Sequence, residues 1–189
     1  MNMKNKIASA LMLMTTSFGL NVNAASIPDD AERYNGHYYK VYDRSMTWSE
    51  ARRYCAQRGG HLVTINSQGE QDFLIDLIQE YGNKNCYWIG GHKNSRGEWR
   101  WITNENTYYA NWAKGQPDNY TGDEDCAMMY RRRNPEASSH IGQWNDIDND
   151  GECNGESFFG THNFGFICEW ESRSSKKSRH YDYYDEDDD

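Results

Sequence analysis

Apolar residues in the first half of the chain recur at the spacing of a helix. Thr47 followed by Glu50 has the pattern of a capping box, which marks a helix start, and Gly59 is a residue type that stops one. The apolar positions between them share one helical face, made of Trp48, Ala51 and Cys55. The pattern therefore predicts a helix that begins at Trp48 and stops at Gly59.

A second helical segment follows after a short strand. Residues 61–65 form a short apolar run that predicts the strand. Ser67 and Glu70 then repeat the capping-box pattern, and Gly82 closes the segment. Its apolar stripe consists of Phe73, Leu74, Leu77, Ile78 and Tyr81.

Helix signals disappear beyond Tyr87, and short apolar runs alternate with loops. These runs predict strands at residues 87–90, 99–102, 126–130 and 164–168. Between Asn104 and Asp125 the chain has little regular pattern. A structureless loop of that length in a compact domain is either functional or evidence against the assignment.

The two ends of the chain differ from the middle. Lys4 and Lys6 precede the mostly apolar residues 7–20, which is typical of a secretory signal peptide, here expected over residues 1–24. Residues 182–189 carry six carboxylates, and we expect a disordered, solubilising tail over residues 171–189. One folded domain is therefore expected over residues 25–170, in a secreted, extracellular protein.

The composition narrows the range of partners. The chain has seven Trp, 14 Tyr and six Phe, a number of aromatic rings that needs a core or a binding surface. Its net charge of −9 argues against nucleic-acid binding, which uses a basic stripe. No apolar run approaches the length that spans a bilayer, so no membrane span is expected.

Hard oxygen ligands gather in and after the irregular segment. They are Gln116, Asp118, Glu124, Asn145 and Asp146. Calcium binds six to eight oxygens and tolerates irregular geometry, so five side chains and one backbone carbonyl would leave about two positions for outside oxygens. No His or Cys cluster has the spacing of a zinc site. For each motif alone, the alternative is an acidic surface loop without an ion.

Taken together, the motifs resemble those of the C-type lectin domain. The resemblance covers residues 34–170 and rests on the order of Trp48, Cys55, Gly59-Gly60-His61-Leu62-Val63, Tyr87-Trp88-Ile89-Gly90-Gly91, Asn111-Trp112, Gln116-Pro117-Asp118, Glu124-Asp125-Cys126, Trp144-Asn145-Asp146, Cys153 and Phe166-Ile167-Cys168-Glu169. It implies an α+β fold with two helices, two small antiparallel sheets and a long calcium-binding loop.

The resemblance also implies one principal calcium site. Its ligands would be the side chains of Gln116, Asp118, Glu124, Asn145 and Asp146, with the backbone oxygen of Asp146 as a further ligand. Pro117 matches a cis proline. In relatives, acidic residues of an auxiliary calcium site come from a segment that corresponds to residues 91–97. Here this segment contains two cationic side chains and no acidic one. We therefore expect only the principal Ca²⁺.

The order of Gln116, Pro117 and Asp118 implies a sugar preference. In the family, Gln-Pro-Asp accompanies galactose-type sugars and Glu-Pro-Asn accompanies mannose-type sugars. Exchanging the acid and the amide between positions 116 and 118 reverses which of the two side chains donates a hydrogen bond to the vicinal hydroxyls of the sugar and which accepts one. The expected sugar-binding residues are Gln116, Asp118, Tyr120, Glu124 and Asn145. Tyr120 is expected either to stack on the apolar face of the sugar or to be an ordinary exposed loop tyrosine.

We expect the cysteines to form disulfide bonds, because a secreted protein folds in an oxidising compartment. The resemblance implies the pairs Cys55–Cys168 and Cys126–Cys153. Cys86 is then left over, and two interpretations remain: a buried thiol, or a disulfide between subunits of a homo-oligomer. A disulfide between subunits would have a functional advantage, because clustering shallow sugar sites multiplies avidity.

Three classes of function compete. The chain shows no Ser-His-Asp set and no paired acid and base, which disfavours an enzyme. A lectin-fold protein that binds a protein surface or ice tends to lose the ligand set, whereas this chain has all five residues. The sequence therefore predicts a calcium-dependent lectin for galactose-type glycans, and a non-sugar partner of the calcium loop is the alternative.

Overall fold

The computed structural model describes residues 26–105, 108–134, 139–151 and 159–172. Its elements are β1 (Glu32–Tyr34), β2 (His37–Tyr42), α1 (Trp48–Gln57), β3 (His61–Leu62), α2 (Gln68–Tyr81), β4 (Cys86–Lys93), β5 (Trp99–Trp101), β6 (Cys126–Tyr130), β7 (Trp144–Ile147), the 3₁₀ helix η1 (Thr161–Asn163) and β8 (Phe164–Glu171). The expected signal peptide and nearly all of the expected tail lie outside the described residues. Glu171, assigned to the tail, is the last residue of β8.

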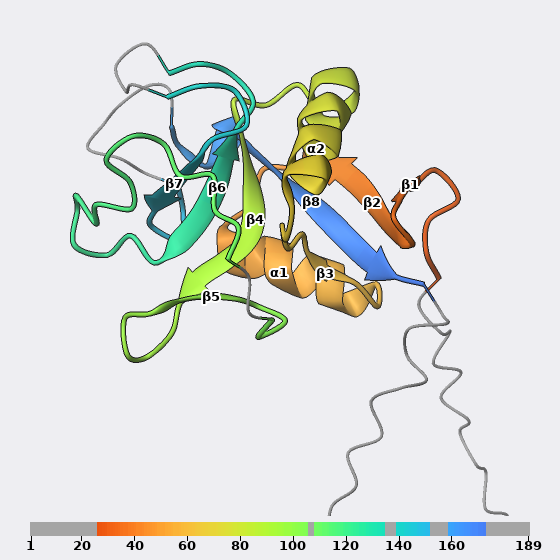
Figure 1. The fold of residues 1–189 in the computed structure, drawn as a ribbon, viewed down its shortest axis with the longest axis horizontal. Coiled ribbons are helices and arrows are strands. Elements are labelled where there is room, and N and C mark those ends of the chain that lie inside the picture. The colour runs from red at the N-terminus through yellow and green to blue at the C-terminus, as the bar shows by residue number, and fades with distance from the viewer. Residues whose placement is uncertain (1–25, 106–107, 135–138, 152–158, 173–189) are drawn as a thin grey trace, which may run out of the picture.

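The described strands form one mixed sheet (Figure 1). Their order is β1-β2-β8-β4-β6-β7, with β3 paired to β8 and β5 paired to β4. The pairs are antiparallel except for β4 and β8, which run parallel from the register Cys86↔Phe164. The resemblance implied two small antiparallel sheets, but the described strands form a single sheet, because the parallel pair of β4 and β8 joins the two antiparallel groups. This pairing places β4 at the centre of the molecule, next to the strands that lead into the long loop.

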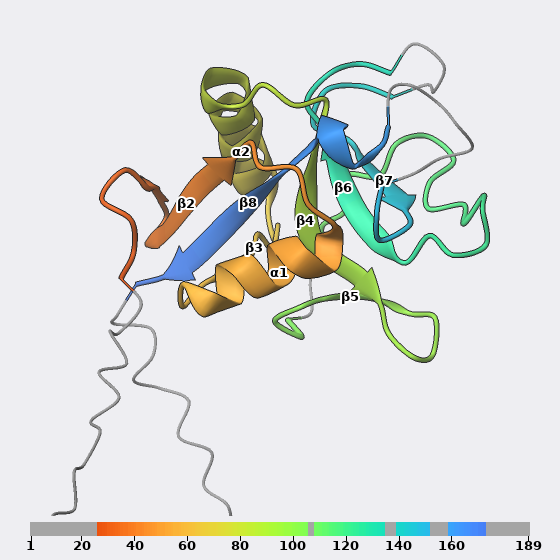
Figure 2. The same ribbon diagram turned by 180° about the vertical axis from the view of Figure 1, so that it is seen from behind.

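Both faces of the central strands are buried, because the two helices lie on opposite sides of the sheet (Figures 1 and 2). Side chains alternate between the faces of a strand. In β8, Phe164 and Phe166 pack in the cluster that contains α1 residues, whereas Ile167 packs in the cluster that contains α2 residues. Burial on both faces explains why β4, β6 and β8 are continuous apolar runs rather than alternating ones.

The helix predictions are confirmed, with one difference in the capping. Thr47 and Glu50 form the complete capping box of α1. At α2, Ser67 accepts the Glu70 amide, but the Glu70 carboxylate accepts from the backbone of Asn66 instead of Ser67. The same carboxylate accepts a 2.7 Å hydrogen bond from the Tyr39 hydroxyl. Glu70 therefore ties the start of α2 to β2.

The strand predictions are confirmed for four of the runs, and the structure corrects the remainder. The strand expected over residues 61–65 is limited to His61–Leu62, although the next residue, Val63, also donates to the backbone of Ile167 in β8. β1, β2 and β7 were not predicted. The predicted disulfide between Cys55 and Cys168 is confirmed, and it joins α1 to β8.

A buried carboxylate connects β8 to two distant segments. The side chain of Glu169 is 2% exposed. One oxygen lies 2.6 Å from Nδ1 of His37 in β2, and the other accepts from the amide and hydroxyl of Thr64 at 2.9 and 3.2 Å. The hydrogen bond to Glu169 raises the pKa of His37 above its usual value, and the negative charges of Glu169, Glu70 and Glu171 add to it against the opposing effect of burial.

This contact predicts a pH-dependent stability. His37 binds its proton more tightly in the folded chain than in the unfolded chain. The contact therefore contributes its full stabilisation below about pH 6.5, and this stabilisation is lost as the pH rises through the raised pKa of His37. We expect His37→Gln to lower the free energy of unfolding by about 1 kcal/mol at pH 6 and by less at pH 8.5. Urea unfolding in chelator measures both values. The exposed His140→Gln is the control, and an equal loss at both pH values would contradict the assignment.

Candidate functional site

Three carboxylates from two separate segments meet at one point of the molecule. Asp118 and Glu124 belong to the long loop between β5 and β6, and Asp146 lies in the middle of β7. One carboxylate oxygen from each of the three lies within 4.8 Å of the others. Asp146 and Glu124 are buried, at 0% and 2% exposure, while Asp118 is exposed. The sequence predicted all three as calcium ligands, and the fold brings them together.

Backbone amides of the loop hold these carboxylates. The two oxygens of Asp146 accept from the amides of Asp118 at 3.1 Å and Asn119 at 2.8 Å. The Glu124 carboxylate accepts from the Tyr120 amide at 2.6 Å. Asn119, with a φ of 51°, closes the turn by accepting the Glu124 amide on Oδ1 at 3.0 Å. The loop therefore folds around its own acidic groups.

The cluster is strongly negative for a partly buried site. Burial raises the pKa of Glu124, and the negative charges of Asp146 and Asp118 raise it further, against the lowering effect of the backbone hydrogen bonds. Lys93 of β4 lies near the cluster, but its ammonium group donates to the backbone oxygen of Glu124 at 2.8 Å and pairs with Asp125 at 3.4 Å. The three carboxylates thus lack a paired cation among the described residues.

The two predicted amide ligands flank the carboxylates. The Gln116 side-chain oxygen accepts from the Asp118 amide at 3.1 Å, and the Gln116–Pro117 peptide bond is cis, as predicted. Asn145 donates its side-chain amide to the backbone oxygen of Asp146 at 2.8 Å. The carbonyl predicted as a sixth ligand therefore already accepts one hydrogen bond. Oδ1 of Asn145 accepts none from the described residues.

The donor set fits a hard divalent cation. All of the converging groups are carboxylate or amide oxygens, which are the ligands that calcium prefers. No His or Cys in the described part of the chain joins the cluster, which disfavours zinc. Tyr120 lies beside the cluster and is 72% exposed, so its ring is accessible to a ligand from solvent.

Sequence reasoning missed the residue that anchors β7 below the cluster. Gln71 of α2 is completely buried. Its side-chain oxygen accepts from the indole of Trp144 at 2.7 Å, and its amide donates to the backbone oxygen of Gly142 at 3.0 Å. Trp144 directly precedes Asn145 and Asp146, so α2 fixes the strand that carries them. A polar residue within an apolar helical stripe is the only local signal of this role.

The remaining cysteines depart from part of the prediction. Cys126 has no disulfide partner among the described residues, and its expected partner, Cys153, lies outside them. Cys86 is completely buried in β4, and burial raises its thiol pKa. Burial disfavours the intersubunit disulfide, because a thiol that is buried in the sheet is not accessible to a second subunit. The alternative, a buried thiol, is what the structure shows.

Comparison with known proteins identifies the family. A model described as "Lectin C-type domain" matches residues 44–159. A "Perlucin-like protein" of Mytilus galloprovincialis is 31% identical over 144 residues, which cover 75% of this chain and 81% of the relative. "C-type lectin lectoxin-Lio1" of Erythrolamprus poecilogyrus is 33% identical over 131 residues, covering 67% of this chain and 80% of the relative.

Solved structures support the same assignment. The cow C-type carbohydrate-recognition domain of CD23, crystallised in the presence of a GlcNAc2Man3 oligosaccharide, has a TM-score of 0.60 and 28% identity, over 78% of this chain and 98% of that one. A calcium-independent type II antifreeze protein shares the fold at a TM-score of 0.58 and 21% identity, over 77% of this chain and 95% of that one. With its family model, its relatives and its fold in agreement, this chain belongs to the C-type lectin domain family.

Proposed function

We propose that the protein is a secreted, calcium-dependent lectin that prefers galactose-type sugars. The observation that carries the proposal is the convergence of Asp118, Glu124 and Asp146 in a loop with two flanking amide side chains. Gln116, Asp118, Glu124, Asn145 and Asp146 would hold the ion. A bound calcium ion would supply open coordination positions for two vicinal hydroxyls of a sugar.

The residues around the ion would set the sugar preference. A carboxylate only accepts hydrogen bonds, whereas a side-chain amide also donates. With an amide at position 116 and an acid at position 118, one hydroxyl meets a donor and the other meets an acceptor, in the order that accompanies galactose-type sugars in the family. The Tyr120 ring, which is exposed to solvent, would stack on the apolar face of the sugar.

The alternative is a calcium-dependent partner other than a sugar. The antifreeze relative shows that this fold also occurs in a protein described as calcium-independent. The acidic cluster favours an ion-dependent activity here, and the carbohydrate-recognition domain among the relatives favours a sugar. Among the described residues no helix is long and apolar enough to cross a membrane. Elution from a galactose resin, tested separately with free galactose and with chelator, distinguishes the two functions. Elution by each reagent supports the lectin, and elution by neither supports another partner.

The first prediction of the proposal concerns calcium and stability. A ligand that binds only the folded state at 100 times its Kd stabilises it by about 2.7 kcal/mol. For a domain of this size we expect calcium to raise the Tm of stripped protein by about 5–10 °C. Differential scanning calorimetry measures the shift. Asp146→Asn should lose it, whereas Asp125→Asn, which changes an exposed neighbour of the cluster, should keep it. An identical melting curve with and without calcium would contradict the site.

The second prediction concerns selectivity. Exchanging acid and amide in the double variant Gln116→Glu, Asp118→Asn reverses donor and acceptor around the ion. Because a hydrogen bond is worth about 1 kcal/mol, we expect galactose binding to fall on the order of tenfold and mannose binding to rise. Titration with both methyl glycosides measures the change. Tyr120→Ala in the parent chain measures the contribution of ring stacking to galactose binding. A double variant that keeps its galactose preference would show that residues other than Gln116 and Asp118 set the preference.

The third prediction concerns the anchor of β7. Gln71→Met keeps the length of the side chain but leaves the Trp144 indole without its acceptor, whereas the Gly142 carbonyl still accepts from the Asn111 side chain. An unpaired buried donor costs about 1–3 kcal/mol, and β7 can shift to relieve it. We expect weaker calcium binding by about tenfold, beyond the loss of stability. Gln79→Met on the same helix removes one exposed hydrogen bond and serves as control. Unchanged calcium affinity in Gln71→Met would refute the anchoring role.

A further inference from the structure

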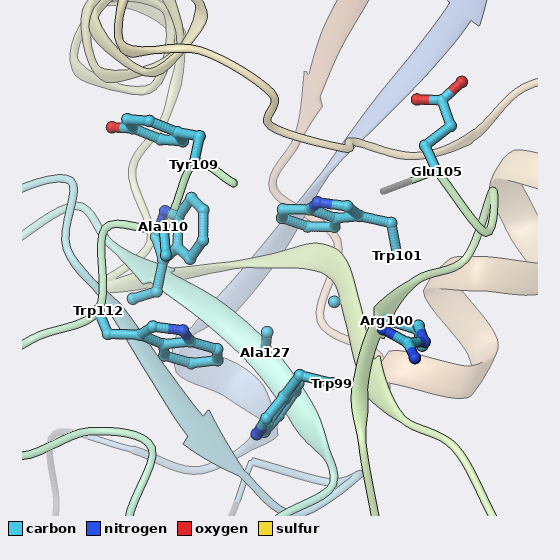
Figure 3. A pocket seen from close by; sticks show the side chains of 10 residues that line it. Trp99, Arg100, Trp101, Glu105, Tyr109, Ala110, Trp112 and Ala127 are labelled. Carbon is cyan, nitrogen blue, oxygen red and sulfur yellow. The ribbon is translucent and has the colours of Figure 1, made fainter. Parts of the chain in front are cut away.

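A cavity of about 170 Å³ lies apart from the carboxylate cluster, and the proposed function does not use it (Figure 3). Five aromatic side chains make most of its lining: Trp99, Trp101, Tyr109, Trp112 and Trp144. They come from β5, from the segment after it and from the start of β7. Two small residues of the sheet, Gly91 and Ala127, complete the lining.

The rings leave a hollow between two walls. Trp99 and Trp112 contact each other, with centroids 4.9 Å apart at 60°, and Trp101 contacts Trp144 at 5.5 Å. Figure 3 shows Trp101 on one side of the hollow, Trp99 and Trp112 on the other, and Ala127 between them. A Cβ atom on Gly91 would lie 2.9 Å from the Ala127 methyl. Small side chains on the sheet thus keep this space open.

The cavity combines aromatic faces with unused hydrogen-bond donors. The Trp144 indole donates to Gln71. In contrast, the indole N–H groups of Trp99, Trp101 and Trp112 donate to none of the described residues. An indole N–H only donates, so these groups need acceptor oxygens from water or from a ligand. A pure hydrocarbon ring would fill the space and leave them without partners.

The charges around the cavity disfavour a cationic ligand. The Lys93 ammonium already lies 5.4 Å from the centroid of the Trp99 ring, and Arg100 lines the same cavity. The carboxylate of Glu105 accepts from the Asn66 side chain at 3.3 Å, and Figure 3 shows it directed away from the indole rings. Aromatic rings bind cations when no competing positive charge is near. The surroundings here suit a neutral ligand.

We propose that this cavity is a second binding site, which takes one neutral pyranose ring and works without calcium. The C–H faces of a pyranose can stack on the indoles, while its hydroxyl oxygens accept from the indole N–H groups. An apolar cavity of about 150 Å³ holds one benzene molecule, so the six-membered ring fits here and some hydroxyl groups of a pyranose would extend out of the cavity. The site therefore has room for a single ring. It depends on none of the residues that form the carboxylate cluster.

The test uses the full chain in excess chelator, with methyl galactoside, methyl glucoside and methyl mannoside as probes and phenol as the aryl alternative. Two-dimensional NMR follows the indole N–H signals. We expect at least one glycoside to shift the signals of Trp99, Trp101 and Trp112 saturably, with a Kd in the millimolar range, about −4 kcal/mol. Asp146→Asn should bind equally well, which separates this site from the calcium site.

Matched variants locate the site. Ala110 is an exposed residue of the lining, so Ala110→Trp should cover the cavity without disturbing the core and weaken glycoside binding at least tenfold. Ser95→Trp adds the same side chain at an exposed position that does not line the cavity and should leave binding unchanged. Saturation by phenol without any response to the glycosides would overturn the proposal, as would equal binding by Ala110→Trp and the parent chain.

Discussion

Mutual repulsion among three carboxylates is the constraint around which the long loop is built. Asp118, Glu124 and Asp146 place oxygens within 4.8 Å of one another, and two of the three side chains are buried. Such a cluster is unfavourable unless donors or a cation compensate it. Backbone amides of residues 118–120 supply part of the compensation. The raised pKa of Glu124 shows that repulsion and burial still outweigh these donors, and a bound divalent cation would remove that imbalance.

The sheet makes the cluster possible by holding one of its two segments rigid. β7 pairs with β6, and Gln71 fixes Trp144 immediately before the two ligand residues. The other segment is a loop that contacts the sheet at several points. Ala113 donates to Trp144 of β7, and the amides of Asp118 and Asn119 donate to Asp146. Near the end of the loop, the backbone oxygen of Glu124 accepts from the Lys93 ammonium group of β4. The fixed strand therefore provides a template on which the loop closes. The same strands also carry the aromatic cavity, which places two candidate ligand sites around Trp144.

Local patterns predicted the elements whose signals are local. The helices followed from capping residues and apolar spacing, and the buried strands followed from apolar runs. β2 was missed because its burial is mixed rather than alternating, and β7 was missed because its residues were interpreted only as ligands. The ligand set could be predicted through the ordered motifs of the family. The roles of Gln71 and Glu169 could not, because both depend on contacts between residues more than 70 positions apart. The aromatic cavity likewise exists only after folding.

The acidic cluster is proposed to form a calcium site in the native chain. Isothermal titration of stripped protein with calcium tests it most directly, because it reports stoichiometry and affinity without requiring any sugar. We expect one calcium ion to bind per chain, with an affinity that drops sharply in Glu124→Gln and is retained in Asp125→Asn. Absence of binding heat and of competition with a calcium-sensitive dye would contradict the calcium site, as would a calcium affinity of Glu124→Gln equal to that of the parent chain.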